Sequence, residues 1–154
     1  LRAGDIGGGF TALNSLDVPR RWKAVGAGRL IEEVPATIKT LTGRDLKPYA
    51  PVQVTGVRSG GDLSLSWQRR TRVGGGSLSG AVPLSEASER YELVFTYDGE
   101  SVSKYAYNAT EYSYTLADFN ADFDLSEVNI PTLSLTLYQL SETIGRGFPA
   151  TEII

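Results

Sequence analysis

The chain runs Pro51-Val-Gln-Val-Thr-Gly-Val-Arg-Ser-Gly-Gly-Asp-Leu-Ser-Leu-Ser-Trp67 at the point that decides its fold. The first part of this stretch is predicted to be a strand, and residues 59–62 are predicted to be a turn. In the second part Leu63, Leu65 and Trp67 alternate with serines. Because successive side chains of a strand point to opposite faces, these three apolar residues share one buried face.

Strand signals recur along the rest of the chain, with turn signals such as Asp98-Gly99 between them. The predicted strands are 90–97, 101–107, 111–116, 132–139 and 148–154. About seven antiparallel strands at this spacing predict an all-β sandwich. Residues 117–126 are expected to form one short helical turn or an irregular loop. The predicted inward-facing residues are Leu63, Leu65, Trp67, Tyr91, Leu93, Phe95, Leu133, Leu135 and Leu137.

The first part of the chain, residues 1–47, has a different character. Residues 22–27 and 35–42 are expected to be strands, but two short strands bury too little surface to stand alone. We therefore expect this segment to complete a sheet whose other strands lie elsewhere, or to pack on the sandwich, which is assigned to residues 48–154. Because the chain starts at Leu1 and contains no methionine, we expect it to be a processed product or part of a longer protein.

Composition excludes several kinds of chemistry. The chain has no cysteine and no histidine, so disulfides, thiol catalysis, the usual neutral-pH general base and the commonest metal ligand are absent. The carboxylates are scattered without a conspicuous pair. We predict no catalytic, cofactor-binding or metal-binding residue and a protein that is not an enzyme. A net charge of −3 gives no general attraction to nucleic acid, and no apolar run has the length of a membrane span.

A basic group follows the tryptophan strand and is a candidate interface. Arg69, Arg70 and Arg72 could bind phosphate, a lipopolysaccharide head group or an acidic patch, because the planar guanidinium meets such groups with two hydrogen bonds. The alternative is a solvated strand end with salt bridges inside the domain, to Glu86, Glu89 or Asp62.

Four tyrosines form a second candidate interface. They fall in two same-parity pairs on neighbouring predicted strands: Tyr105 with Tyr107, and Tyr112 with Tyr114. Within one sheet such residues could form a cross-strand ladder, and tyrosine is enriched at protein interfaces. The alternative is ordinary packing in the core or at its rim.

The stretch Asp118-Phe-Asn-Ala-Asp-Phe-Asp124 is similar to the opening of a calcium-binding loop. However, Phe123 stands where such a loop needs glycine, and Asn129 stands where it needs a bidentate glutamate. We therefore expect a polar loop in which Phe119 or Phe123 points inward.

Several stretches in one order carry a resemblance to known proteins. The strand pair 51–67, followed by Tyr91-Glu-Leu-Val-Phe95, resembles a fibronectin type III domain, an immunoglobulin-like fold. A larger set resembles the C-terminal part of the tail hub, or tail-tip host-specificity protein, of tailed phages and gene transfer agents. Its members are residues 46–52, 63–75, 82–86 and 137–150, of which Trp67-Gln-Arg-Arg-Thr-Arg72 and Gly145-Arg-Gly-Phe-Pro149 are the most specific.

That resemblance implies a structural virion component at the distal tail tip or baseplate. Such hubs are trimers, and their C-terminal domains resemble attachment points for fibres or receptor-binding proteins, with a host receptor or glycan as a further partner. Residues 1–47 would then be the end of the preceding hub domain. The alternative is a carbohydrate-binding sandwich of a secreted or surface polysaccharide-active protein, which predicts a flat, exposed aromatic platform.

Replacing Trp67 with alanine is expected to destabilise the domain by about 3–5 kcal/mol, because it removes a large buried aromatic side chain. Chemical denaturation of the variant and the wild type measures this difference. A midpoint close to that of the wild type would contradict the inward placement of Trp67.

Overall fold

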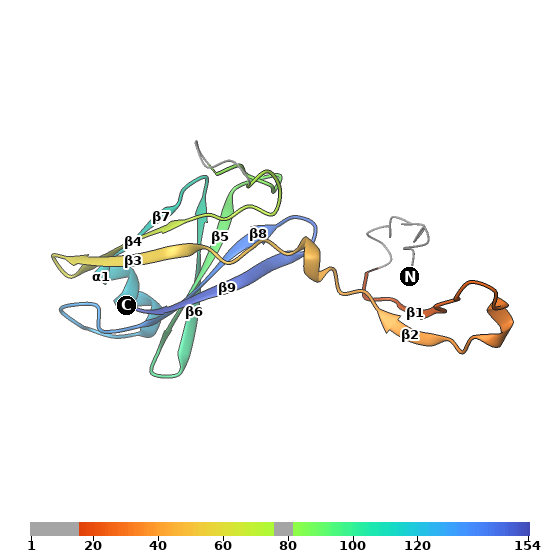
Figure 1. Cartoon of the computed structure of the whole chain (residues 1–154). Helices are drawn as coiled ribbons and strands as arrows, with labels where there is room; N and C mark the ends of the chain where they lie inside the picture. The colour runs from red at the N-terminus through yellow and green to blue at the C-terminus, as the bar shows by residue number, and fades with distance from the viewer. Residues whose placement is uncertain (1–15, 76–81) are drawn as a thin grey trace. The chain divides into compact units, whose positions relative to one another are not determined.

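The chain divides into two units, Leu1–Leu46 and Lys47–Ile154, which are described separately here. The structure is a computed structural model that describes residues 16–75 and 82–154 (Figure 1). All four sequence stretches that carry the resemblance, 46–52, 63–75, 82–86 and 137–150, therefore lie within the described residues.

The second unit is a sandwich of two antiparallel sheets. One sheet has three strands in the order β3-β4-β7, and the other has four in the order β6-β5-β8-β9 (Figure 1). The strands of the first are β3 (Val52–Ser59), β4 (Asp62–Gln68) and β7 (Glu111–Tyr114). Those of the second are β5 (Arg90–Tyr97), β6 (Glu100–Tyr107), β8 (Ser134–Ser141) and β9 (Gly145–Ile153). This arrangement is that of a fibronectin type III-like sandwich, so the predicted fold class is confirmed.

The core lies between the two sheets, and all nine residues expected to face inward are buried in it. Trp67 of β4 meets Tyr91 of β5 edge to face, with ring centroids 5.0 Å apart. Phe95 of β5 stacks on Tyr114 of β7 at 4.2 Å. Each of these contacts joins one sheet to the other, and aromatic pairs in such geometries add to the stabilisation that burial itself gives.

A helix, α1 (Leu116–Phe123), fills the gap between β7 and β8 in the chain. The sequence predicted a single helical turn or a loop, but Thr115 caps a longer helix by accepting a hydrogen bond from the Asp118 backbone amide. Phe119 and Phe123, one turn apart on one face, are both buried against the core. Burial of this apolar pair explains why the helix continues to Phe123.

One side of the sandwich is tied shut between its edge strands β3 and β9. The Arg58 guanidinium of β3 donates to the carbonyl oxygens of Pro131 at 2.6 Å and of Ile154 at 3.1 Å. The Leu133 amide donates to the Ile154 carbonyl, and the Ile154 amide to the Leu133 carbonyl. The end of the chain is therefore fixed to both sheets.

The entry to the sandwich is packed against β9. Pro48 is fully buried, and its carbonyl accepts a hydrogen bond from the Phe148 amide at 2.9 Å. Gly147 permits this approach, because a Cβ atom there would lie 2.7 Å from the Pro48 carbonyl oxygen and 2.8 Å from that of Gln139.

The first unit contains a short hairpin, β1 (Pro19–Trp22) and β2 (Thr37–Thr40), with 3-10 turns at Ile31–Glu33 and Arg44–Leu46. The first strand ends at Trp22, where the sequence had predicted it to begin, and the second is shorter than expected. Gly28, at φ +82°, lies in the connection between them. All residues of both strands are exposed. No helix in residues 16–75 and 82–154 is both long and apolar enough to cross a membrane.

Replacing Gly147 with alanine is expected to destabilise the sandwich by about 1–3 kcal/mol, since the two atoms nearest to the new methyl group are backbone carbonyl oxygens. Gly26 is the matched control, because a Cβ atom there meets nothing within 4 Å. Urea denaturation of the two alanine variants measures the difference, and equal midpoints would contradict the close approach at Gly147.

Candidate functional site

Two exposed tyrosines mark the outer face of the four-stranded sheet. Tyr105 and Tyr107 lie on the edge strand β6 with 47% and 62% of their surface exposed. They are two residues apart, so they point to the same face, and their ring centroids are 6.5 Å apart. Large aromatic groups held side by side in solvent form a contact surface with little conformational entropy to lose on binding.

A buried carboxylate with a stacked guanidinium continues this surface across the sheet. Glu92 of β5 lies opposite Tyr105 of β6 and opposite Tyr138 of β8. The Arg146 guanidinium of β9 donates two hydrogen bonds of 2.6 Å to the Glu92 carboxylate. The same guanidinium lies over the Tyr138 ring, 4.9 Å from its centroid. We call Glu92, Tyr105, Tyr107, Tyr138 and Arg146 the tyrosine face.

The electrostatics of the tyrosine face are balanced. Hydrogen bonds from Arg146 hold the pKa of Glu92 below its ordinary value, against the opposing effect of burial, and those from Ser103 and Tyr105 act in the same direction. Glu92 is 4% exposed, so its charge is covered by the guanidinium above it. The charges of Arg146 and Glu92 therefore cancel, and the tyrosine face is aromatic and close to neutral.

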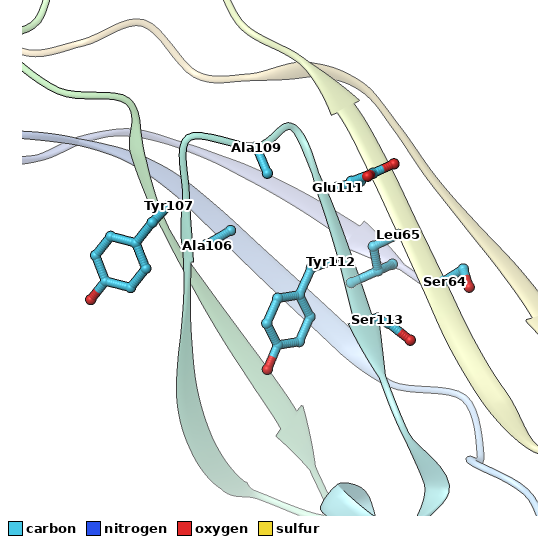
Figure 2. A pocket seen from close by; sticks show the side chains of 8 residues that line it. All are labelled: Ser64, Leu65, Ala106, Tyr107, Ala109, Glu111, Tyr112 and Ser113. Atoms are coloured by element: carbon cyan, nitrogen blue, oxygen red, sulfur yellow. The ribbon is translucent and has the colours of Figure 1, made fainter.

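A groove of about 400 Å³ lies around the other side of β6, where the two sheets separate. Figure 2 shows its lining: Tyr107 lies on one side of β6, and Tyr112 lies between β6 and β7. The small side chains of Ala106 and Ala109 leave this space open. Tyr107 borders both the groove and the tyrosine face, so the two form one continuous surface around the β6 edge.

The four tyrosines do not form the ladder that one shared sheet would allow, because β6 and β7 belong to different sheets, and the alternative of ordinary packing describes Tyr112 and Tyr114. Tyr114 is fully buried, and its hydroxyl donates to the Asp122 carboxylate at 2.7 Å. Burial, and then that hydrogen bond, raise the pKa of Tyr114. Tyr112 is half-buried in the groove. Of the four, only Tyr105 and Tyr107 are available to a partner as an exposed pair.

Two of the three arginines of the basic group are already paired within the domain. Arg69 pairs with Glu89 at 2.9 Å, and Arg72 pairs with Glu86 at 2.6 Å. Arg70 is exposed and lies 5.0 Å from the centre of the Tyr49 ring. Residues 82–89, before β5, lie against residues 69–72, after β4, and this brings the two glutamates to the two arginines. The alternative of salt bridges inside the domain therefore describes Arg69 and Arg72.

Aspartates of the calcium-like stretch 118–124 form hydrogen bonds within the fold. Asp118 accepts a hydrogen bond from the Thr115 hydroxyl at the start of α1, and Asp122 accepts one from Lys104 at 2.8 Å. Among residues 16–75 and 82–154, no cluster of three or more metal-ligating side chains occurs. The expectation that Phe119 or Phe123 points inward is correct for both, within a helix in place of a loop.

Sequence reasoning missed Glu92, Tyr138 and Arg146. Parity alone places Glu92 and Tyr138 on the outer faces of their strands, and Arg146 belongs to the specific Gly145–Pro149 stretch. The missing information was strand order: Arg146 meets Glu92 because β9 and β5 both pair with β8.

Comparisons with known proteins gave matches of low sequence identity among solved structures. No family model matches the chain, and no curated protein matches it. Among solved structures, a fibronectin type III domain from a human protein has 17% identity and a TM-score of 0.47, covering 71% of this chain and 74% of that one. Domains d3 and d4 of the rat CD45 extracellular region have 10% identity and a TM-score of 0.49, covering 99% and 71%. A structure described as a myokine has 13% identity and a TM-score of 0.43, covering 70% and 95%.

Replacing Glu92 with glutamine is expected to destabilise the sandwich at neutral pH by on the order of 1 kcal/mol. The value is modest because Arg146 is more than half exposed and water screens the pair. A carboxylate with a lowered pKa stabilises the fold above its unfolded-state value, near 4.5, and this contribution is lost as the pH falls through the lower folded-state value.

The difference between variant and wild type should therefore shrink as the pH drops below about 4.5. Urea denaturation at several pH values measures it. Glu142→Gln is the control, because Glu142 is exposed and its contact with Arg90 is long, at 3.7 Å. A gap between Glu92→Gln and wild type that stays constant with pH would contradict a charged Glu92.

Proposed function

We propose that this chain is a non-enzymatic docking module of a phage particle, the C-terminal part of a tail hub or tail-tip protein. In this proposal it attaches tail fibres or receptor-binding proteins at the distal tail and takes part in host attachment. The assembled hub would be a homotrimer, and no cofactor or nucleic acid is involved. The sandwich would bind through the tyrosine face and the adjoining β6 edge.

The observation that supports docking most directly is the exposed pair Tyr105 and Tyr107 beside the neutral Glu92–Arg146 pair. Tyrosine and arginine are over-represented among residues that dominate binding energy at interfaces. A rigid sheet holds these side chains in place, so a partner would meet a surface that is already organised.

The phage setting is supported by the sequence stretches quoted above. One of the most specific, Gly145-Arg-Gly-Phe-Pro149, forms the start of β9 and supplies Arg146 to the tyrosine face. The other, which begins at Trp67, forms the end of β4 and the salt-bridged segment after it. Arg146 therefore belongs both to a stretch that carries the resemblance and to the candidate binding surface.

A second candidate function is carbohydrate binding by a secreted or surface polysaccharide-active protein. The specific observation in its favour is that two exposed tyrosine rings lie side by side on the outer face of a sheet. Under this alternative the isolated chain would bind glycans directly, whereas a docking module would bind proteins.

The test uses the full chain and the proteins encoded by the reading frames next to its own in the genome, with binding measured by biolayer interferometry. We expect one or more of them to bind, and we expect the double variant Tyr105→Ala, Tyr107→Ala to weaken binding at least about tenfold. Tyr49→Ala is the matched control, since Tyr49 is an exposed tyrosine outside the tyrosine face, with the Arg70 guanidinium over its ring.

Circular dichroism and a denaturation midpoint show that each variant is folded. Equal affinity of the double variant and Tyr49→Ala would contradict a role for the tyrosine face. Binding to a panel of neutral glycans, with no binding to the neighbouring proteins, would replace docking by the carbohydrate alternative.

A further inference from the structure

The edge of β6 carries backbone groups that the sheet does not use. Asp98 and Gly99, both at positive φ, form the two-residue turn between β5 and β6, so Tyr97 and Glu100 form a hydrogen-bonded pair. The Asn108 amide donates to the Glu89 carbonyl at the other end of the ladder. Since hydrogen-bonded and non-hydrogen-bonded pairs alternate, the even-numbered residues of β6 bond to β5. The odd-numbered ones point their amides and carbonyls outward: Ser101, Ser103, Tyr105 and Tyr107.

The other three edge strands of the sandwich carry features that discourage pairing with another chain. β3 follows Pro51 and has an irregular register between Val52 and Thr55, with Gln53 at φ +52°. β9 contains Pro149, and its register shifts between Tyr138 and Leu140. β7 is only four residues long.

β6 has none of these features. It pairs with β5 over eight residue pairs without a shift in register, and it contains no proline. Two charged residues of β6 share its inward face: Glu100 beside the turn and Lys104 in the middle of the strand. Lys104 is held by Asp122 at 2.8 Å, and that hydrogen bond raises the pKa of Lys104. A long, regular edge whose central charge is already paired is a template for an added strand.

Room for side chains exists on both faces of a strand placed beside β6. On the outer face, Tyr105 and Tyr107 are exposed next to the edge. On the inner face lies the groove of about 400 Å³, where Ala106 and Ala109 leave space beside Tyr112 (Figure 2). Side chains of a strand alternate between its two faces, so successive residues of an added strand would meet the tyrosines and the groove in turn.

We propose that β6 receives an extended segment of the partner protein, which adds as a fifth strand to the four-stranded sheet. This inference rests on the proposed docking function and specifies how the partner binds. The segment carries apolar or aromatic side chains at alternate positions, because the surface it meets is largely aromatic and the charges of Glu92 and Lys104 beside it are paired internally. Main-chain hydrogen bonds hold the segment, and the groove selects its side chains.

A second copy of this chain suits the edge less well. Antiparallel pairing of β6 with another β6 would put two Lys104 side chains on the same face of one strand pair, and this arrangement offers no charge complementarity between the copies. Each Asp122 is already bound to its own Lys104 and Tyr114. The occupant is therefore assigned to a different polypeptide.

The probe is a displayed library of random decapeptides, selected for binding to the full chain. We expect the selected peptides to protect the amides of Ser101, Ser103, Tyr105 and Tyr107 from hydrogen exchange, while the even-numbered amides keep the protection they already have. Peptides that protect amides elsewhere, or a library that gives no binder, would overturn the proposal.

The decisive variant is Ser103→Pro, which removes one outward amide of the edge strand. We expect it to weaken the selected peptides at least about tenfold, and we expect Ser103→Ala, which loses the same hydroxyl, to bind within about threefold of wild type. If Ser103→Pro does not fold, as judged by its denaturation midpoint, Ser101→Pro next to the turn takes its place. Equal binding by the proline and alanine variants would overturn strand addition.

Two further results separate this inference from the proposed function. If neighbouring proteins lose binding to Tyr105→Ala, Tyr107→Ala but bind Ser103→Pro as tightly as wild type, docking stands and strand addition fails. If both sets of variants bind as wild type does, docking at this surface fails too. Sedimentation of the free chain tests the homotypic alternative: a dimer that Ser103→Pro dissociates would overturn the assignment to a different polypeptide.

Discussion

The structure of the sandwich depends on the contact between the Leu63–Leu65–Trp67 stripe of β4 and the Tyr91–Leu93–Phe95 stripe of β5. These strands belong to different sheets, so the contact defines the spacing between the layers. Each stripe is buried by its contact with the other. Burying apolar surface is the dominant favourable term in folding. The outward residues that alternate with these stripes are thereby fixed as well, and the position of Glu92 beneath Arg146 is one consequence.

The two sheets are joined differently along the two open sides of the sandwich. On the side of β3 and β9, Arg58 and the last residue of the chain join the sheets through backbone carbonyls. On the side of β6 and β7, α1 and the Lys104–Asp122–Tyr114 contact join the sheets along only part of their length, and the remainder is the groove. An asymmetry of this kind leaves one edge available for recognition while the fold as a whole stays closed.

Sequence reasoning was accurate where the physical rule is local. Alternation identified the inward residues of β4, β5 and β8 because a strand has a period of two whatever its neighbours are. It was inaccurate where a rule needs to know which strands are adjacent. The tyrosine ladder assumed that β6 pairs with β7, but the chain crosses to the other sheet after Tyr107. The extent of α1 was also underestimated, because burial of Phe119 and Phe123 extends a helix that local preferences alone leave short.

By itself, the sequence determined the class of fold, the inward residues of the central strands and the absence of histidine and cysteine chemistry, since these follow from residue types and from a period along one strand. Only the tertiary structure decided which polar residues are already paired and which surface is left over. Arg69 and Arg72 form salt bridges inside the domain, because residues 82–89 bring two glutamates to them. Arg146 is part of the tyrosine face because β9 and β5 both pair with β8. Pairings of this kind depend on distances between residues far apart in the chain, which a one-dimensional pattern does not contain.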